Sequence, residues 1–324
     1  MHALSLRYVG RRLLQLVPTV LVILGIGFLL IRLAPGDPVL AIAGEHGDAA
    51  YYAFMRHRYG LDQPLTRQFT SYVGHVLRGD LGFSYVYGRA TLGVIVERVP
   101  ATLLLTGTAL VLSVVVAIPL GAVAASYPHG ARDAAISAVA LMLYSTPAFW
   151  VGQLAILALS LRLGLFPVQG MTSAQDTAGS YAQAWDVLRH LVLPATVLAA
   201  QEIAVLVRIT RTALLDELSR DHLRTAYAKG LSRWQALVRH ALPRALLPVI
   251  TIVGARVGHL LAGAAVVEII FGWPGMGRLL LGALQARDTP ILLGLFLVGS
   301  FSVVLANLLS DLAYAAFDPR VRVG

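Results

Sequence analysis

Hydrophobic residues gather along this chain in six long runs that polar stretches separate. The runs cover residues 13–33, 100–125, 134–160, 191–209, 246–270 and 290–316. Because an α-helix rises about 1.5 Å per residue, roughly 20 apolar residues are enough to cross the hydrocarbon core of a bilayer. Strands and ordinary core helices do not need runs of this length. The pattern therefore predicts an all-α integral membrane protein with six transmembrane helices and with both termini on the same side.

The first run could also belong to a secretory signal peptide, because Arg7, Arg11 and Arg12 precede it. Its length of about 20 residues exceeds the 7–15 residues that are typical of the apolar region of a signal peptide. The first A-x-A-like cleavage pattern after the run, at 41–43, lies well beyond the end of the run. We therefore expect residues 1–33 to form an uncleaved transmembrane helix.

The stretch after the first helix differs in composition from the rest of the chain. Residues 34–98 contain six arginines, six acidic residues and nine aromatic residues, but no run that could span a membrane. This aromatic content is untypical of a flexible linker. We expect a folded extracytoplasmic segment at 34–93, a membrane core of five helices at 94–317 and a short cytoplasmic tail at 318–324.

The charged residues indicate the orientation of the helices. Only 13% of the residues are charged, which is about half the share in a soluble domain. One set of predicted loops has 14 basic and five acidic residues and comprises 1–12, 126–133, 208–244 and 318–324. The other set has ten basic and nine acidic residues and comprises 34–98, 161–190 and 271–289. By the positive-inside rule, the first set and both termini are cytoplasmic. The net charge of +9 thus indicates orientation, and we expect no nucleic-acid partner.

Two residue types exclude further classes of protein. The chain has no cysteine, which excludes disulfides and thiolate metal sites. Its single lysine, Lys229, is followed by Gly230, whereas a phosphate-binding P-loop requires the pattern G-x-x-x-x-G-K-[ST]. The chain therefore has no P-loop, and we expect it not to be an enzyme. Any energy-driven process must draw on an ion gradient or on another polypeptide.

The basic loop at 211–245 is the most informative cytoplasmic segment. A short helix at 221–229 is predicted to stop at Gly230, because glycine readily adopts the left-handed conformation that ends helices. Ser232 and Gln235 then form the S-x-x-Q capping-box pattern, so a second helix begins at once.

Leu223, Ala226 and Tyr227 lie on the first of these two short helices. So short a helix cannot bury an apolar face by itself. Two interpretations remain open from spacing alone. The face could pack against the chain's own membrane helices, or the helix could dock a cytoplasmic partner.

The same loop resembles the coupling loop of ATP-binding-cassette importer permeases. That signature reads E-A-A-x-x-x-G, followed thirteen residues after the glycine by the proline of a Leu-Pro pair, and Gly230 and Leu242-Pro243 have this spacing. Arg224 and Thr225 replace the Glu and the first Ala, which resembles the R-T-A-x-A-K-G version of the dipeptide/oligopeptide/nickel subfamily. The resemblance assigns ATPase docking and coupling to Arg224, Thr225, Ala226, Lys229, Gly230, Leu231, Leu242 and Pro243.

Further strings that match this subfamily follow one another along the whole chain. They are Leu33–Pro38, Gly60–Leu65, Arg78–Gly82, Glu97–Thr102, Pro147–Trp150, Val267–Gly275, Arg287-Asp288 and Asp318–Arg322. The resemblance implies the type I importer permease fold in a bacterial cytoplasmic (inner) membrane. It also implies a homologous second permease, two ATPase subunits that bind ATP and Mg, and an extracytoplasmic solute-binding protein, with no cofactor or metal in this chain. Peptides are the implied solute, and nickel, glutathione or another small solute are the alternatives.

Charged residues also occur in or beside the apolar runs, and they are Arg32, Glu202, Arg256, Glu268 and Asp311. A charge at the bilayer centre costs about 2.5–3.5 kcal/mol on insertion scales, so such residues face a cavity or a partner. Glu202, Arg256 and Glu268 are candidates for the translocation path or its gate. The alternatives are structural ion pairs and, for Arg32 and Asp311, positions at the level of the lipid headgroups.

The turn-rich segment at 271–277 lies between the last two apolar runs. Trp273 and Pro274 are candidates for an outer gate, and an interfacial turn that is anchored by the tryptophan is compatible with that role.

Other classes of membrane protein fit the sequence less well. An intramembrane protease needs a nucleophile motif or a metal motif, and neither G-x-S-x-G nor H-E-x-x-H occurs. A secondary carrier that is driven by an ion gradient usually shows internal repeats, and we find none, but this carrier remains the alternative from another class. Uptake that follows a proton or sodium gradient without ATP would identify it.

Overall fold

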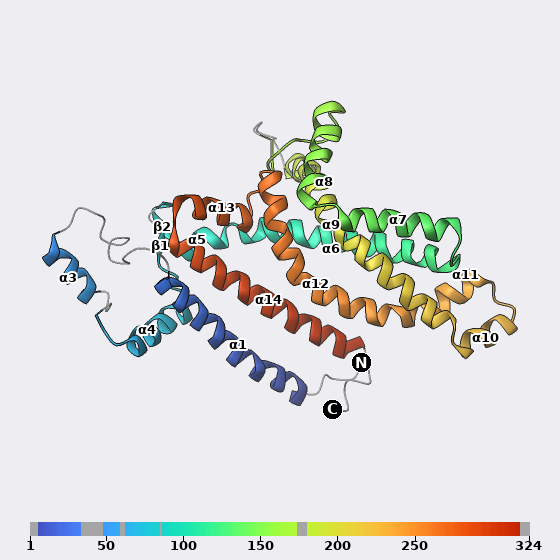
Figure 1. Cartoon of the computed structure of the whole chain (residues 1–324), viewed down its shortest axis with the longest axis horizontal. Coiled ribbons are helices and arrows are strands. Elements are labelled where there is room, and N and C mark those ends of the chain that lie inside the picture. Colours follow the sequence, from blue (N-terminus) through green and yellow to red (C-terminus); the bar gives the residue numbers. More distant parts are fainter. Residues whose placement is uncertain (1–5, 34–47, 59–61, 85, 174–179, 318–324) are drawn as a thin grey trace. The chain divides into compact units, whose positions relative to one another are not determined.

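The computed structural model describes residues 6–33, 48–58, 62–84, 86–173 and 180–317 (Figure 1). Three of the matching strings, Leu33–Pro38, Gly60–Leu65 and Asp318–Arg322, fall wholly or partly outside the described residues, as does the predicted tail at 318–324. The chain divides into two compact units. The first contains residues 1–12, 98–281 and 302–324, and the second contains 13–97 and 282–301.

The first unit is built from long helices and a group of short ones. Its elements are α6 (Val99–Ser126), α7 (Ala131–Ser145), α8 (Ala148–Ala155), the π-helix η1 (Ile156–Arg162), α9 (Ser180–Leu218), α10 (Asp221–Ala228), α11 (Arg233–Ala236), the π-helix η2 (Leu237–Ala241), α12 (Leu242–Ile270) and the start of α13 (Met276–Ala286). The second half of α14 (Thr289–Phe317) also belongs to it. The described part of the chain is thus almost wholly helical, as predicted.

Helix α9 packs against α6, α7 and α12 and forms the centre of the first unit (Figure 1). Small residues on α6 permit a close approach of α6 and α9. A Cβ atom added at Gly121 would lie 2.7 Å from Thr210 Cβ on α9. Small residues at helix interfaces are typical of membrane proteins, because lipid tails give helices no hydrophobic reason to associate and contact must come from packing.

The third apolar run is not one straight helix. Helices α7 and α8 meet at an angle of 101°, and Pro147 stands at the break between them. Thr146 has the extended backbone that a following proline favours, with φ −86° and ψ 126°. The run at 134–160 is therefore bent at its proline, and its crossing of the membrane as one broken span stays a prediction. Pro119, in contrast, lies inside α6 without interrupting it.

The other predicted runs also lie on helices. By length and composition, three helices of the described chain can cross a membrane, at 91–126, 181–218 and 289–308, and up to five can do so if each bent pair counts as one span. The first run lies on α1 (Leu6–Leu33), whose apolar described part, Leu14–Leu30, is shorter.

The second unit contains the segment that was predicted to be folded. Besides α1 and the start of α14, it includes α3 (Ala49–Arg58), α4 (Leu65–Leu77), the strands β1 (Phe83–Ser84) and β2 (Arg89–Ala90), and α5 (Thr91–Val96). The strands pair in antiparallel register. Phe28 of α1 lies against Phe69 and Tyr72 of α4, with ring centroids 5.4 and 5.9 Å apart.

Two carboxylates accept hydrogen bonds that stabilise the turns of this second unit. Asp288 is buried, accepts a hydrogen bond from the hydroxyl of Ser84 and caps α14 through the backbone N–H of Ile291. Asp80 accepts hydrogen bonds from the backbone N–H of Gly82 and from His75. These bonds, with that of Gly82 first, lower the pKa of Asp80 below its ordinary value.

Candidate functional site

The predicted loop between two helices forms at the end of α9, where α12 begins (Figure 1). Helix α10 ends at Ala228, and Gly230 follows with φ +87°. The backbone N–H groups of Gly230 and Leu231 donate to the carbonyl groups of Tyr227 and Ala226, at 2.9 and 3.3 Å. This pair of backbone hydrogen bonds to the last turn of the helix is typical of a helix that ends at a glycine. The predicted helix end is confirmed.

The predicted capping box is also present in full. The N–H of Gln235 donates to Ser232 Oγ at 3.3 Å, and the N–H of Ser232 donates to Gln235 Oε1 at 3.1 Å. The next helix, α11, therefore begins three residues after Gly230. Because both helix ends are fixed by local chemistry, the loop has a defined shape before any partner contacts it.

The inner face of the loop packs against the chain's own helices. Leu223 and Ala226 are buried, and Leu223 belongs to an apolar cluster with Ala122, Ala125, Leu214, Ala236, Leu237, Ala241 and Ala245. Leu231 and Leu242 lie at the edge of this cluster. For this face, packing against the chain's own membrane helices is confirmed. Ala226 and Leu242 therefore support the loop from inside.

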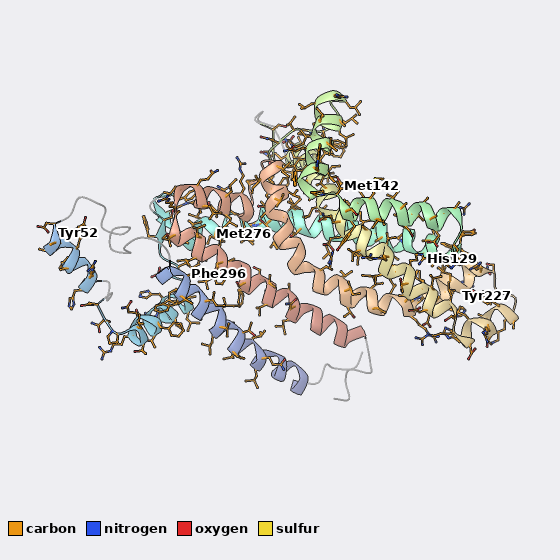
Figure 2. All side chains as sticks on the ribbon, in the orientation of Figure 1. Tyr52, His129, Met142, Tyr227, Met276 and Phe296 are labelled. Carbon is orange, nitrogen blue, oxygen red and sulfur yellow. The ribbon has the colours of Figure 1, made fainter. Side chains whose placement is uncertain are left out.

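The outer face of the loop is exposed and strongly basic. Arg224, Thr225, Lys229 and Pro243 are exposed, and Tyr227 is partly exposed on α10 (Figure 2). Between residues 219 and 244 the chain has six basic residues and a single acidic one. That acidic residue, Asp221, pairs with Arg224 at 3.4 Å on the solvent side of α10. The structure thus leaves a cationic surface outside the apolar cluster.

Two of the intramembrane charges pair with each other. Glu202 of α9 accepts a hydrogen bond from Arg256 Nε of α12 at 2.7 Å, and both side chains are largely buried. Sequence spacing could not show this pairing, because the rotations of the two helices are set only by their packing. Arg32 and Asp311 lie on α1 and α14, but their side chains are outside the described part of the structure. A path or gate role for the pair stays a prediction.

The third charge, Glu268, is fully buried at the end of α12. Its carboxylate accepts hydrogen bonds from Thr102 Oγ1 of α6 at 2.6 Å and from the backbone N–H groups of Gly277 and Arg278, at 2.6 and 3.2 Å. The same threonine hydroxyl accepts a bond from the N–H of Met276 at 2.8 Å. Glu268 therefore caps the first turn of α13.

The turn that precedes α13 is anchored as well. Trp273 is buried, and its Nε1 donates to the carbonyl of Ala101 at 2.8 Å. A Cβ atom added at Gly275 would collide with the carboxylate of Glu268, and one at Gly277 would collide with Ala265. The anchored turn that was predicted from Trp273 is present, while an outer gate at Trp273 and Pro274 stays a prediction.

Sequence reasoning missed two carboxylates near the loop. Asp133 of α7 accepts two hydrogen bonds from Arg211 of α9, at 2.5 and 2.7 Å. Glu217, in the last turn of α9, is buried among three basic side chains. Glu217 lies beside an open cleft of about 530 Å³ that Arg208, Asp216, Arg220 and Arg244 also line. A glutamate at a helix C-terminus is the one local signal that was available, because the helix dipole disfavours it there.

The described residues include no group of three acidic or histidine side chains that could hold a metal ion. The features above define a helical membrane protein whose apolar helices carry a structured cationic loop. The chain belongs to the family of binding-protein-dependent transport system inner membrane components, whose model matches residues 117–323. A second model, of the N-terminal part of such membrane components, matches residues 5–106.

Relatives from Escherichia coli strain K12 match almost the whole chain. The dipeptide transport system permease protein DppB is 39% identical over 98% of this chain and 99% of its own length. The glutathione transport system permease protein GsiC is 38% identical over the same shares. The chain is thus a permease of an ATP-binding-cassette importer in the inner membrane, and such permeases are transport components.

A solved structure supports the fold. The methionine transporter MetNI, described in inward-facing conformations, is similar with a TM-score of 0.56 and 16% identity, over 70% of this chain and 97% of that chain. At this identity the likeness concerns the fold alone. It confirms the predicted type I importer permease fold.

Proposed function

We propose that this chain moves peptides across the cytoplasmic membrane by alternating access, and that separate ATPase subunits drive it through the loop around Gly230. The observation that carries the proposal is the exposed cationic outer face of α10 and α11 on a buried apolar base. A force applied to such a face is passed on to the helices beneath, because packed interiors deform little.

The helices that the loop would move are those to which it is joined in the chain. Helix α10 is joined to α9 and, through α11 and η2, to α12. When two ATPase subunits close around ATP and Mg, they would push the loop and shift these helices together. The bundle, paired with a homologous second permease, would then change between inward-facing and outward-facing states. The positive charge of the loop also supports a cytoplasmic location for it and for both termini.

Peptides are the solute class that the relatives favour. One relative is named for dipeptide and another for glutathione, which is itself a small peptide. An extracytoplasmic binding protein would select the solute and deliver it. Glutathione, nickel or another small solute remain alternatives, and a binding assay on the cognate binding protein decides among them.

The substitution Gly230→Glu tests the coupling role. A Cβ atom at this position meets no atom within 4 Å, so the change adds a negative charge to the outer face without a clash. The backbone at φ +87° costs a non-glycine residue about 1–2 kcal/mol. Gly88→Glu is the matched control, because Gly88 also has a positive φ of +63° and open space but lies in the turn between β1 and β2.

In proteoliposomes with the cognate ATPases and binding protein, we expect Gly230→Glu to reduce solute-stimulated ATP hydrolysis about tenfold or more, a common size for coupling between sites. The Gly88→Glu control should keep the stimulation. Full stimulation in the Gly230→Glu variant would refute coupling through this loop. Uptake driven by an ion gradient in the absence of ATP would instead support the secondary carrier.

A further inference from the structure

Glu217 forms a junction between the loop and two membrane helices. Its carboxylate lies 2.9 Å from Arg220 Nε, 3.2 Å from His222 Nε2 and 3.5 Å from Arg244 Nη1. Arg220 is the N-cap residue of α10, His222 lies in the first turn of that helix and Arg244 lies in the first turn of α12. One side chain of α9 therefore contacts the starts of the next short helix and of the next long helix.

The position of Glu217 contradicts the local preference of its own helix. A carboxylate in the last turn of α9 opposes the helix dipole, whose negative end lies there. Glu217 is nevertheless only 6% exposed, although a buried charge is costly unless it is paired. The guanidinium groups of Arg220 and Arg244 compensate for both effects. A residue that breaks a local rule and is compensated by tertiary contacts is a candidate for a functional role.

The apolar cluster and the junction contribute different properties to the loop. Apolar packing of Leu223 holds α10 against the bundle, but the hydrophobic effect is not directional. Charge-assisted contacts fix distances and orientation. Among the described residues, Glu217 is the only carboxylate with ion pairs to arginines at the starts of both α10 and α12. Asp221, the acidic residue of α10, pairs with Arg224 of the same helix.

We propose that Glu217 is a positioning residue for coupling, which makes α10 move together with α9 and α12 when the outer face of the loop is pushed. This proposal rests on the proposed function. Without the junction, the loop would remain folded on its apolar base and would still present its basic outer face. Its displacement would no longer be passed fully to the two long helices.

The test compares Glu217→Gln with Asp216→Asn in the chain assembled with its cognate ATPases and binding protein. Glutamine keeps the size of the side chain and removes its charge. Asp216 is the matched control, because it is the preceding residue of α9 and lines the same cleft. It is exposed and has no ion pair with another described residue. Basal ATP hydrolysis, solute-stimulated ATP hydrolysis and amide hydrogen exchange in α10 are measured for both variants.

We expect Glu217→Gln to keep the ATPases bound and to keep basal hydrolysis, while the ratio of stimulated to basal hydrolysis falls about fivefold or more, as for the loss of an allosteric coupling. Amide exchange in α10 should become faster. Asp216→Asn should change neither quantity, and Glu217→Asp should recover part of the ratio because it restores the charge. Arg244→Gln removes the contact of Glu217 with α12 and should also lower the ratio of stimulated to basal hydrolysis. This variant keeps the test valid if the Glu217→Gln chain fails to insert into the membrane.

An unchanged ratio in both Glu217→Gln and Arg244→Gln would overturn the proposal. Loss of the ATPases from the Glu217→Gln complex would also overturn it, because the residue would then be needed for docking itself. Failure of the proposed function has a different signature, since the unaltered chain would show no solute-stimulated hydrolysis at all. The exchange rate of α10 in the chain alone then still reports whether the junction orders that helix.

Discussion

The buried contact between Thr102 and Glu268 is the most direct test of the interpretation of the outer turn. The substitution Thr102→Val keeps the shape of the side chain and removes its hydroxyl group. Thr102 is only 2% exposed, so water cannot replace the lost group. The variant removes one donor from the carboxylate and leaves the N–H of Met276 without its acceptor.

The cost follows from these two losses. A hydrogen bond to a charged group contributes about 1.5–3 kcal/mol, and a buried donor left without a partner costs about 1–3 kcal/mol. Together they give an expected loss of about 2.5–6 kcal/mol in the free energy of unfolding, which is large for one substitution. The α13 cap and the preceding turn should loosen at the same time.

Thr106→Val provides the matched control one helical turn further along α6. Thr106 is also buried, but its hydroxyl donates to the carbonyl of Thr102 within the same helix, at 2.8 Å. That carbonyl keeps its backbone partner when the hydroxyl is removed, so the cost should stay below about 1 kcal/mol. Thermal unfolding of the purified complex measures both variants, and transport is measured beside it.

Equal unfolding midpoints for the two valine variants would refute the reasoning. So would a Thr102→Val variant that unfolds like the unaltered protein yet transports much more slowly, because Glu268 would then act in the path. A double-mutant cycle with Glu268→Gln separates these cases. It should give a coupling energy of about 1–3 kcal/mol if the two side chains stabilise each other directly.

Three further results are expected. Glu202→Gln should destabilise the protein by about 3–5 kcal/mol in thermal unfolding, because Arg256 keeps a buried charge without its partner; the double variant Glu202→Gln/Arg256→Gln should recover part of this loss, and no recovery would contradict the pairing. The pKa of Asp80 is lowered in the folded chain, so its stabilising contribution is present above its unfolded pKa of about 3.9 and is lost as the pH falls through the lower folded value. Proteolysis or amide exchange around residue 80 should increase as the pH falls through this range. Asp80→Asn should abolish this pH dependence. Ser232→Ala should cost about 1 kcal/mol of local stability and speed amide exchange in α11, while unchanged exchange would show that packing alone fixes the start of this helix.

Local chemistry made much of this protein predictable from its sequence. The apolar runs predicted the helices, because the length that spans a bilayer does not depend on which neighbours a helix packs against. Gly230 and the pair of Ser232 and Gln235 predicted one helix end and the next helix start, since those conformations and hydrogen bonds involve near neighbours. Basic residues in the loops likewise predicted an orientation without any tertiary contact.

The bend at Pro147 and the burial of the loop's inner face were decided by packing. A proline after an extended residue permits a break, but the 101° angle depends on what the two helices pack against. The same holds for Leu223, whose burial requires α6 and α12 to lie beneath it.

The charged contacts show the difference most clearly. The sequence by itself determined that Glu202, Arg256 and Glu268 lie in apolar surroundings and therefore need partners. Only the tertiary structure decided that two of them pair across α9 and α12, that Glu268 caps α13 with the help of Thr102, and that Glu217 joins three helix ends. Their partners are up to 166 residues away in sequence. Helix rotation and crossing angle determine which partner each charged residue meets, and both are set by the fit of whole helix surfaces.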